Sequence, residues 1–79
     1  MSWEKLNNSL IKTYTFNSFV EVIDFVNKIT PACEKLNHHP NFYVFDYRHI
    51  KFELTTHDEN GLSSKDYELA DLIDSLYIK

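Results

Sequence analysis

One amphipathic stripe constrains the fold of this chain more than any other feature. Apolar side chains recur at steps of three and four residues: Phe19, Val22, Ile23, Val26, Ile29, Cys33 and Leu36. This spacing places them on one face of an α-helix, so we predict a long helix that runs to about Asn37. Asn17 or Ser18 can cap its N-terminus, because a short polar side chain accepts a hydrogen bond from the first turn.

Two prolines set limits on this helix. Pro31 lies inside it and lacks the N–H that would bond to the carbonyl of Asn27, so we expect a kink or a break into two helices. Pro40 ends the segment, because the residue before a proline is pushed out of the helical region. The helix therefore exits through a corner formed by His38, His39 and Pro40.

Three segments have the composition and period-two pattern of β-strands: residues 10–16, 42–47 and 50–57. In the last segment, the residues assigned to the core face are Ile50, Phe52, Leu54 and Thr56. The residues assigned to the open face are Lys51, Glu53, Thr55 and His57. The second and third strands join near Arg48 and His49, and we interpret His49 as a solvated turn residue.

A second helix is predicted after the polar turn at residues 58–61. Ser63 followed by Asp66 resembles a capping box, and the helical stripe comprises Leu69, Leu72, Ile73 and Leu76. Asp71 and Asp74 are expected to face solvent. The order strand, helix, two strands, helix predicts an α+β fold, in which both helices pack on one face of a mainly antiparallel sheet of four or fewer strands.

The composition describes one small acidic domain. The chain has 79 residues and a formal charge of −4, and a chain this short has room for one core, so residues 1–79 are expected to form a single domain. No basic patch is present to follow nucleic-acid phosphates, and the longest apolar run, residues 42–45, is far shorter than a membrane-spanning helix needs. With one cysteine and no signal-peptide segment, we expect a cytoplasmic protein that binds neither nucleic acid nor membranes.

Three histidines fall at the ends of predicted elements, where sites are commonly built. His38 and His39 leave the long helix, and His57 leaves a strand. Imidazole titrates near neutral pH, so histidines that face one cleft can donate and accept protons. Two other interpretations stay open: a histidine pair stabilises a helix C-terminus by about 0.3–1 kcal/mol, and three histidines can hold a catalytic zinc.

The residues around these histidines form a longer pattern. Glu34 precedes the His-His-Pro corner by three intervening residues, a Thr-Thr-His-Asp run ends the third strand, and Asp66 follows His57 by nine positions. In these stretches the chain resembles the pterin-4a-carbinolamine dehydratases. Trp3 and residues 15–37 are also similar to the first strand and long helix of that family, so the likeness covers nearly the whole chain.

The resemblance implies the removal of water from a 4a-hydroxytetrahydropterin in tetrahydrobiopterin recycling, which needs no metal or organic cofactor. It assigns acid–base roles to His38 and His57 and pterin holding mainly to His39. It places Asp66 and Glu34 as partners that orient or charge-pair the histidines. The remaining residues that it places around the pterin ring are Asn37, Thr55, Thr56 and Asp58.

The chain also departs from the family pattern. It resembles a short form without the N-terminal helix that family members usually have. Phe42 stands where a tryptophan is usual, and one extra residue between Pro40 and Tyr47 predicts a bulge or a register shift. Pro31 replaces an ordinary helix former in the helix from which the family builds an oligomer contact.

Two alternatives to catalysis stay open. One is a binding module of the kind that serves as a dimerisation cofactor of a transcription factor through the long helix. The other is a pterin-binding protein of molybdenum-cofactor metabolism. In each case we expect a homo-oligomer, either a dimer or a tetramer, because Val20 and Phe25 lie off the core stripe and would leave apolar surface on a small monomer.

Overall fold

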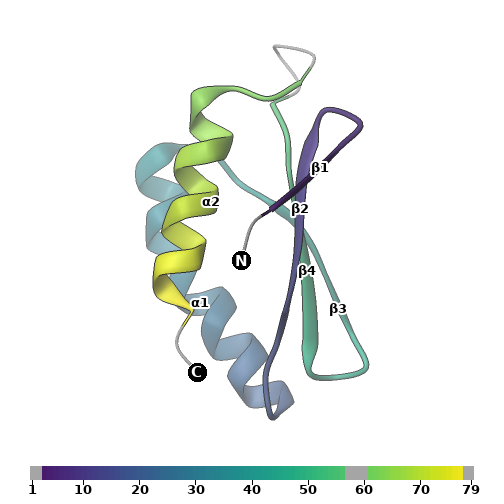
Figure 1. Ribbon diagram of the computed structural model, residues 1–79. Coiled ribbons are helices and arrows are strands. Elements are labelled where there is room, and N and C mark those ends of the chain that lie inside the picture. Colours follow the sequence, from purple (N-terminus) through teal and green to yellow (C-terminus); the bar gives the residue numbers. More distant parts are fainter. Residues whose placement is uncertain (1–2, 57–60, 78–79) are drawn as a thin grey trace.

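The computed structural model describes residues 3–56 and 61–77 and has two layers, a sheet and a pair of helices (Figure 1). Its elements are β1 (Glu4–Leu6), β2 (Ser9–Thr15), α1 (Phe19–Leu36), β3 (Asn41–Phe45), β4 (His49–Leu54) and α2 (Ser64–Leu76). The four strands pair antiparallel in the order β1-β2-β4-β3, and both helices lie on one face. The predicted α+β fold is confirmed.

Strand β1 is the one described element that was not predicted. It has three exposed residues, too few to show a period, and it joins β2 through Asn7 and Asn8. Both asparagines have positive φ angles, of 51° and 66°, as the twist of a two-residue hairpin turn requires. The order is therefore β-β-α-β-β-α rather than β-α-β-β-α.

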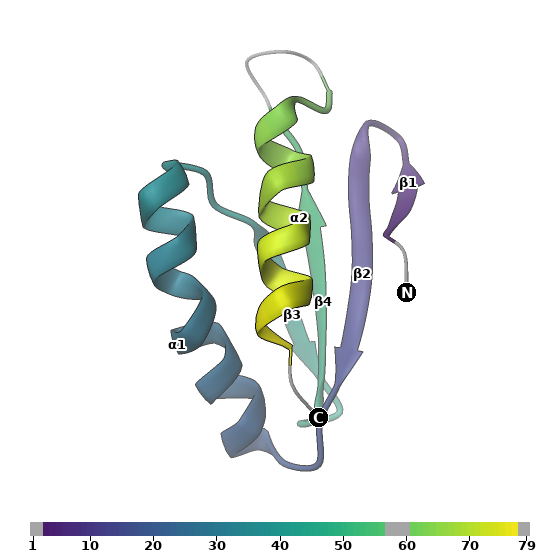
Figure 2. The same ribbon diagram turned by 60° about the vertical axis from the view of Figure 1, so that its left-hand side comes forward.

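Helix α1 forms where the apolar stripe predicted it. The Ser18 side chain accepts a hydrogen bond from the backbone N–H of Glu21 at 3.2 Å, which confirms the N-cap. The helix continues through Pro31 to Leu36, so a break into two helices is wrong (Figure 2). Pro31 is exposed, and its ring is thereby kept out of the packed interface between the two layers.

The buried face of α1 is rotated relative to the predicted stripe. Its buried residues are Val22, Phe25, Ile29 and Cys33. Phe19 and Ile23 are 51% and 39% exposed, so their assignment to the core was wrong, as was the assignment of Phe25 to the surface. The cause is the aromatic cluster beneath the helix, where the Phe25 ring lies 5.2 Å from Phe16 and 5.4 Å from Tyr14.

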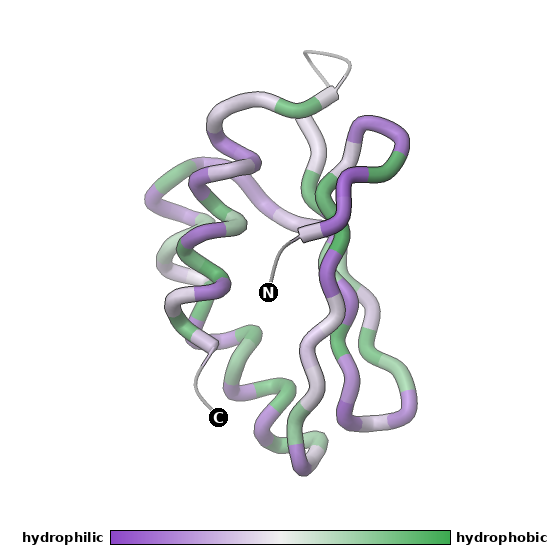
Figure 3. The backbone as a smooth tube through the Cα atoms, in the orientation of Figure 1, coloured by the Kyte–Doolittle hydropathy of each residue, from purple (hydrophilic) through white to green (hydrophobic). Residues whose placement is uncertain are grey.

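The core face of the sheet agrees with the period-two pattern. Ile50, Phe52 and Leu54 are fully buried beneath the helices, and the tube in Figure 3 shows hydrophobic positions recurring along β4. Full burial of one such side chain contributes about 1.5–3 kcal/mol. From α2, the predicted stripe residues Leu69 and Ile73 complete this core.

The hairpin between β3 and β4 has no bulge within its ladder. The pairs run without interruption from Asn41 opposite Glu53 to Phe45 opposite His49. The expected bulge is therefore wrong for this ladder, whereas a register shift relative to the family stays a prediction. The turn contains Asp46 and Tyr47, whose φ angles of 48° and 53° are left-handed and let a three-residue connection reverse the chain.

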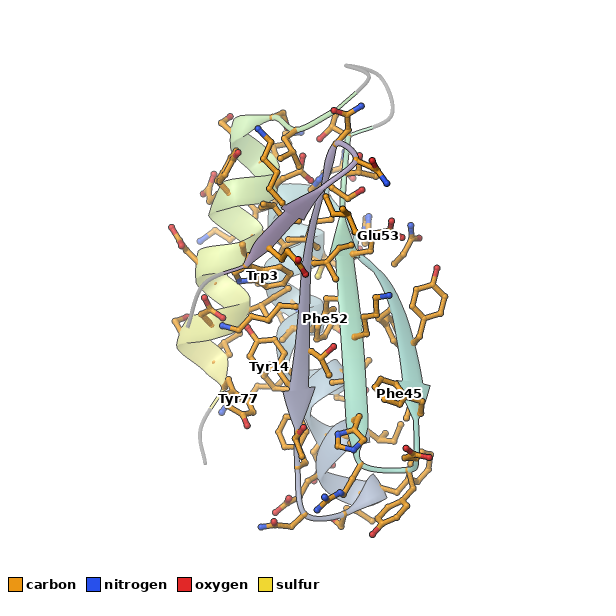
Figure 4. The ribbon with its side chains drawn as sticks, turned by 45° about the vertical axis from the view of Figure 1, so that its right-hand side comes forward. Trp3, Tyr14, Phe45, Phe52, Glu53 and Tyr77 are labelled. Carbon is orange, nitrogen blue, oxygen red and sulfur yellow. The ribbon has the colours of Figure 1, made fainter. Side chains whose placement is uncertain are left out.

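Helix α2 carries an acid that was wrongly assigned to solvent. Asp74 accepts hydrogen bonds from the Trp3 indole at 3.1 Å, the Lys12 ammonium at 2.5 Å and the Tyr14 hydroxyl. Figure 4 shows Trp3, Tyr14 and Tyr77 gathered beside α2. Asp74 thus links the N-terminal hairpin to the last helix, whereas Asp71 is exposed, as expected.

Neither of the two described helices combines the length and the apolar character that crossing a membrane requires.

Candidate active site

Three element ends meet at one end of the molecule: the C-terminal ends of α1 and β4 and the N-terminal end of α2 (Figure 1). Asn37 closes α1 in the left-handed conformation, with φ 53°. Its N–H bonds to the Glu34 carbonyl, and the N–H of His38 bonds to the Cys33 carbonyl, both at 3.1 Å. This helix ending satisfies terminal carbonyls and turns the chain, so that the histidine pair leaves toward the sheet.

His38 contacts the first turn of α2. Its Nε2 atom lies 2.5 Å from the Oδ1 atom of Asp66, although the residues are 28 positions apart. The Asp66 side chain is completely buried, and that of His38 is 13% exposed. A histidine that keeps some access to solvent is therefore held by a carboxylate that has none.

Three groups donate hydrogen bonds to the Asp66 carboxylate, and His38 is the first of them. The Oδ2 atom of Asp66 accepts hydrogen bonds from the Thr56 hydroxyl at 2.6 Å and from the Ser63 N–H at 3.0 Å, the latter as the predicted capping box requires. Burial alone raises the pKa of Asp66, but the hydrogen bonds from Thr56, His38 and Ser63 outweigh burial and lower this pKa below its ordinary value. Asp66 is therefore a carboxylate at neutral pH.

The charge of Asp66 determines how His38 is oriented. A carboxylate accepts hydrogen bonds only, so Nε2 of His38 faces it as a donor. In the neutral ring, Nδ1 is then the acceptor, and in the cationic ring both nitrogens donate while Asp66 stabilises the charge. The contact between Nε2 and Asp66 is therefore compatible with both the neutral and the cationic form of the ring.

His39 has a separate carboxylate partner on the helix. Its Nε2 atom lies 2.6 Å from Oε2 of Glu34, and the two side chains are 56% and 69% exposed. An exposed pair of this kind contributes little to stability. Its effect is to hold the His39 ring near the hollow that His38 also lines.

A hollow of about 280 Å³ lies beside these histidines. Its lining residues come from the α1 exit, from the start of β3 and from the end of β4: Asn37, His38, His39, Asn41, Glu53, Thr55 and Thr56. Its size is close to the lower end of the range for small-molecule sites. Five of these seven residues were predicted from the sequence to surround a pterin.

The threonines at the end of β4 have distinct partners. The Thr55 hydroxyl donates to the Asn8 carbonyl at 2.8 Å, and Thr56 bonds to Asp66 and, at 2.8 Å, to the Ser63 hydroxyl. The backbone of Thr56 pairs with Gly61. His57 and Asp58 lie outside the described residues.

Sequence reasoning missed two residues of the hollow and misplaced one histidine. Asn41 and Glu53 line the hollow, and the only sequence signal was that Glu53 shares a period-two face with Thr55. His49 is not a solvated turn residue, since it begins β4, is half-buried and has its Nδ1 atom 2.8 Å from the Thr15 hydroxyl. Its partner comes from β2, which the local sequence could not reveal.

The fold and the site together define an α+β domain with a histidine–carboxylate pair beside a hollow at one end of its sheet. The family model for pterin 4 alpha carbinolamine dehydratase matches residues 1–76. The chain belongs to this family of hydro-lyases, as its sequence resemblance implied.

Curated relatives are similar in sequence to this chain over most of their length and most of its own. A putative pterin-4-alpha-carbinolamine dehydratase of Sulfolobus acidocaldarius is 42% identical over 74 residues, which cover 94% of this chain and 80% of the relative. One from a Picosynechococcus species is 40% identical, with coverage of 94% and 79%.

Solved structures show the same fold. A transcriptional coactivator/pterin dehydratase from Brucella melitensis superposes with a TM-score of 0.88 at 26% identity, over 95% of this chain and 81% of that chain. A pterin dehydratase-like protein identified as a RuBisCO assembly factor in the alpha-carboxysome has a TM-score of 0.76 at 20% identity, over 96% and 89% of the two chains. At that identity, the second likeness concerns the fold alone.

Proposed function

We propose that this protein dehydrates a 4a-hydroxytetrahydropterin to the quinonoid dihydropterin in tetrahydrobiopterin recycling. The observation that carries the proposal is the contact between Nε2 of His38 and the buried Asp66 carboxylate, 2.5 Å apart, at the edge of a hollow. Family membership supplies the substrate class. The reaction breaks the C4a–O bond, protonates the departing hydroxyl and takes a proton from a ring nitrogen.

In this proposal the acid–base groups are His38 and His57. Asp66 holds His38 in the tautomer whose Nδ1 accepts a proton, and the cationic ring is available to protonate the leaving hydroxyl. Glu34 orients His39, which holds the pterin. The other proposed substrate-contacting residues are Asn37, Thr55, Thr56 and Asp58.

The direct test is the dehydration of a synthetic 4a-hydroxytetrahydropterin by purified protein, with His38→Ala and His57→Ala as variants. We expect each variant to lose at least tenfold in rate while its circular dichroism spectrum is unchanged, because a positioned acid or base contributes about 10²–10⁴-fold. Asp71→Asn, on the exposed face of α2, is the matched control. A wild-type rate equal to the uncatalysed rate would refute the proposal.

A second candidate function is protein binding through α1. One observation favours it: Phe19, Val20 and Ile23 are 51%, 67% and 39% exposed on one end of that helix. We name these three residues the α1 patch. The earlier expectation rested on Val20 and Phe25, and Phe25 is buried, so the α1 patch replaces it as the basis for a proposed dimer or tetramer.

Light scattering distinguishes the proposed oligomer from a monomer. We expect an oligomer at micromolar concentration, and Val20→Glu should shift it toward the monomer, because a charge on the patch opposes apolar contact. A wild-type chain that is monomeric under these conditions contradicts the proposed oligomer.

The proposed compartment is the cytoplasm, since Cys33 is a free and buried thiol.

A further inference from the structure

Glu53 lines the hollow together with the residues of the α1 exit. It is the residue of β4 that pairs with Asn41, the first residue of β3. The ladder between these strands begins at this pair, so the β3 side of Thr55 and Thr56 borders the hollow instead of another strand. Figure 4 places Glu53 at the end of β4 where the chain leaves the sheet.

Two hollows meet at this carboxylate. The one beside the histidines and a neighbouring one of about 470 Å³, which extends toward Asn8 and Gly61, share Asn41, Glu53, Thr55 and Thr56. Glu53 is half-buried. It therefore stands within one continuous concave surface, where a ligand that reaches the histidines passes close to it.

The carboxylate of Glu53 has no polar partner among the described residues. No ion pair or side-chain hydrogen bond joins it to any of residues 3–56 or 61–77. The other two carboxylates near the histidines, those of Glu34 and Asp66, each bond to a histidine. A half-buried carboxylate that stays unpaired keeps its acceptor capacity for a ligand, because two charge-assisted hydrogen bonds would offset its partial desolvation.

A pterin offers the complementary group. The amino-pyrimidinone half of the ring carries an exocyclic 2-amino group and an adjacent ring N–H, which point in the same direction and match the two oxygens of a carboxylate. We propose that Glu53 recognises this edge and sets the specificity of the site for a 2-amino-4-oxo ring. The inference rests on the proposed function for its ligand and adds a residue which that function does not include.

This role differs from catalysis. Glu53 would hold the half of the ring system that does not react, with equal strength in the ground state and in the transition state. Removal of such uniform binding raises KM and leaves kcat unchanged. A site that pairs with a substrate N–H also rejects an analogue that lacks it, because its own polar group is then left unpaired.

The chain contains a matched control. Glu4 lies in the same cross-strand row as Glu53, since both pair with Ile11 of β2, one from each side. The two acids therefore share a face of the sheet, about 10 Å apart across two strand spacings. Glu4 is exposed and lines neither hollow, so Glu4→Gln makes the same change of charge and size away from the site.

The experiment compares wild type, Glu53→Gln and Glu4→Gln as full chains. Calorimetry measures the Kd of a non-reacting 7,8-dihydropterin and of its 2-oxo analogue, in which oxygen replaces the amino group, and a dehydration assay gives kcat and KM. For Glu53→Gln we expect the pterin Kd and KM to rise about tenfold or more, with kcat within twofold of wild type. The preference of wild type for the amino over the 2-oxo ring should narrow, because a glutamine amide can donate to the oxo group.

The outcomes are separable. Equal pterin Kd values for wild type and Glu53→Gln, with normal turnover, overturn the role of Glu53 and leave the dehydratase proposal standing. Tight and selective pterin binding that depends on Glu53, without turnover by wild type, supports the recognition role and refutes the dehydratase. Equal weakening in Glu4→Gln would show a general effect of charge and overturn the inference.

Discussion

His38 and Asp66 are joined by a 2.5 Å contact between Nε2 and Oδ1, across 28 positions of sequence. The contact connects the exit of α1 to the first turn of α2, and the carboxylate is completely buried. Because Asp66 also accepts from Thr56 and Ser63, the position of the histidine depends on three segments of the chain. A change at Asp66 should therefore affect both catalysis and folding, in ways that can be measured separately.

Asp66→Asn is expected to lower kcat at least tenfold. The amide can donate to Nε2 of His38, which would favour the tautomer with its proton on Nδ1, and it cannot stabilise the cationic ring. The weakened capping box should cost about 1 kcal/mol of unfolding free energy. Urea denaturation and the dehydration assay check the two effects, and Asp71→Asn serves as the control. Full activity in Asp66→Asn would show that this pair does not act in catalysis.

The fold should lose stability in acid because of two carboxylates. The pKa of Asp66 is lowered as described above, and at Asp74 hydrogen bonds from Lys12, Tyr14 and Trp3 outweigh the raising effect of burial and lower the pKa as well. A lowered folded-state pKa contributes stability that is complete above the unfolded-state value of about 4 and is lost as pH falls through the folded-state value. Thermal melts between pH 7 and pH 2 should show the decline only below about pH 4.

Asp74→Asn tests how much of the acid-dependent stability comes from the hydrogen bonds between Asp74 and the N-terminal hairpin. The variant should lose about 2 kcal/mol at pH 7, because three donors are left with a neutral partner. The difference from wild type should shrink as the pH falls below the unfolded-state pKa of about 4 and through the lowered folded-state pKa of Asp74, because the carboxyl group then becomes protonated in both states. Fluorescence of Trp3, whose indole donates to Asp74, reports the local change. A difference that stays constant with pH would contradict this account.

Phe25→Ala and Val20→Ala should separate the two faces of α1. Phe25 is 4% exposed within the aromatic cluster, so its truncation should cost about 3–5 kcal/mol. Val20 is 67% exposed, so its truncation should change the stability of the monomer by less than about 0.5 kcal/mol. Urea unfolding under dilute conditions measures both. Similar losses for the two variants would show that the helix face is assigned wrongly.

Pro31→Ala is expected to stabilise the protein. Proline inside a helix costs about 3 kcal/mol or more, through the lost hydrogen bond and the ring clash, and about 0.4–1 kcal/mol of this is offset by its restriction of the unfolded chain. Because Pro31 is exposed, alanine removes no packing. We expect the free energy of unfolding to rise by about 2 kcal/mol, seen as a higher melting temperature. A lower free energy of unfolding would show that α1 needs the proline for its native conformation.

Local features of this protein could be predicted from the sequence because neighbouring residues determine them. The helical span of α1, the Ser18 cap, the His-His-Pro exit and the Ser63–Asp66 capping box all depend on residues within a few positions of one another. The alternation along β4 likewise separated the core residues from the face that carries Glu53 and Thr55. The resemblance to the dehydratase family added the site residues, which spacing alone left open to other interpretations.

Only the tertiary structure decided which distant groups meet. The rotation of α1 that buries Phe25, the contact of His49 with Thr15 and the three donors around Asp74 each join segments that local patterns treat separately. Glu53 is the clearest case. The alternation along β4 predicts that Glu53 lies on the open face of the sheet. Its place in the hollow follows from where β3 starts and from the path of the chain after α1. The period of a strand determines which face a side chain lies on, but not which other residues lie near that side chain.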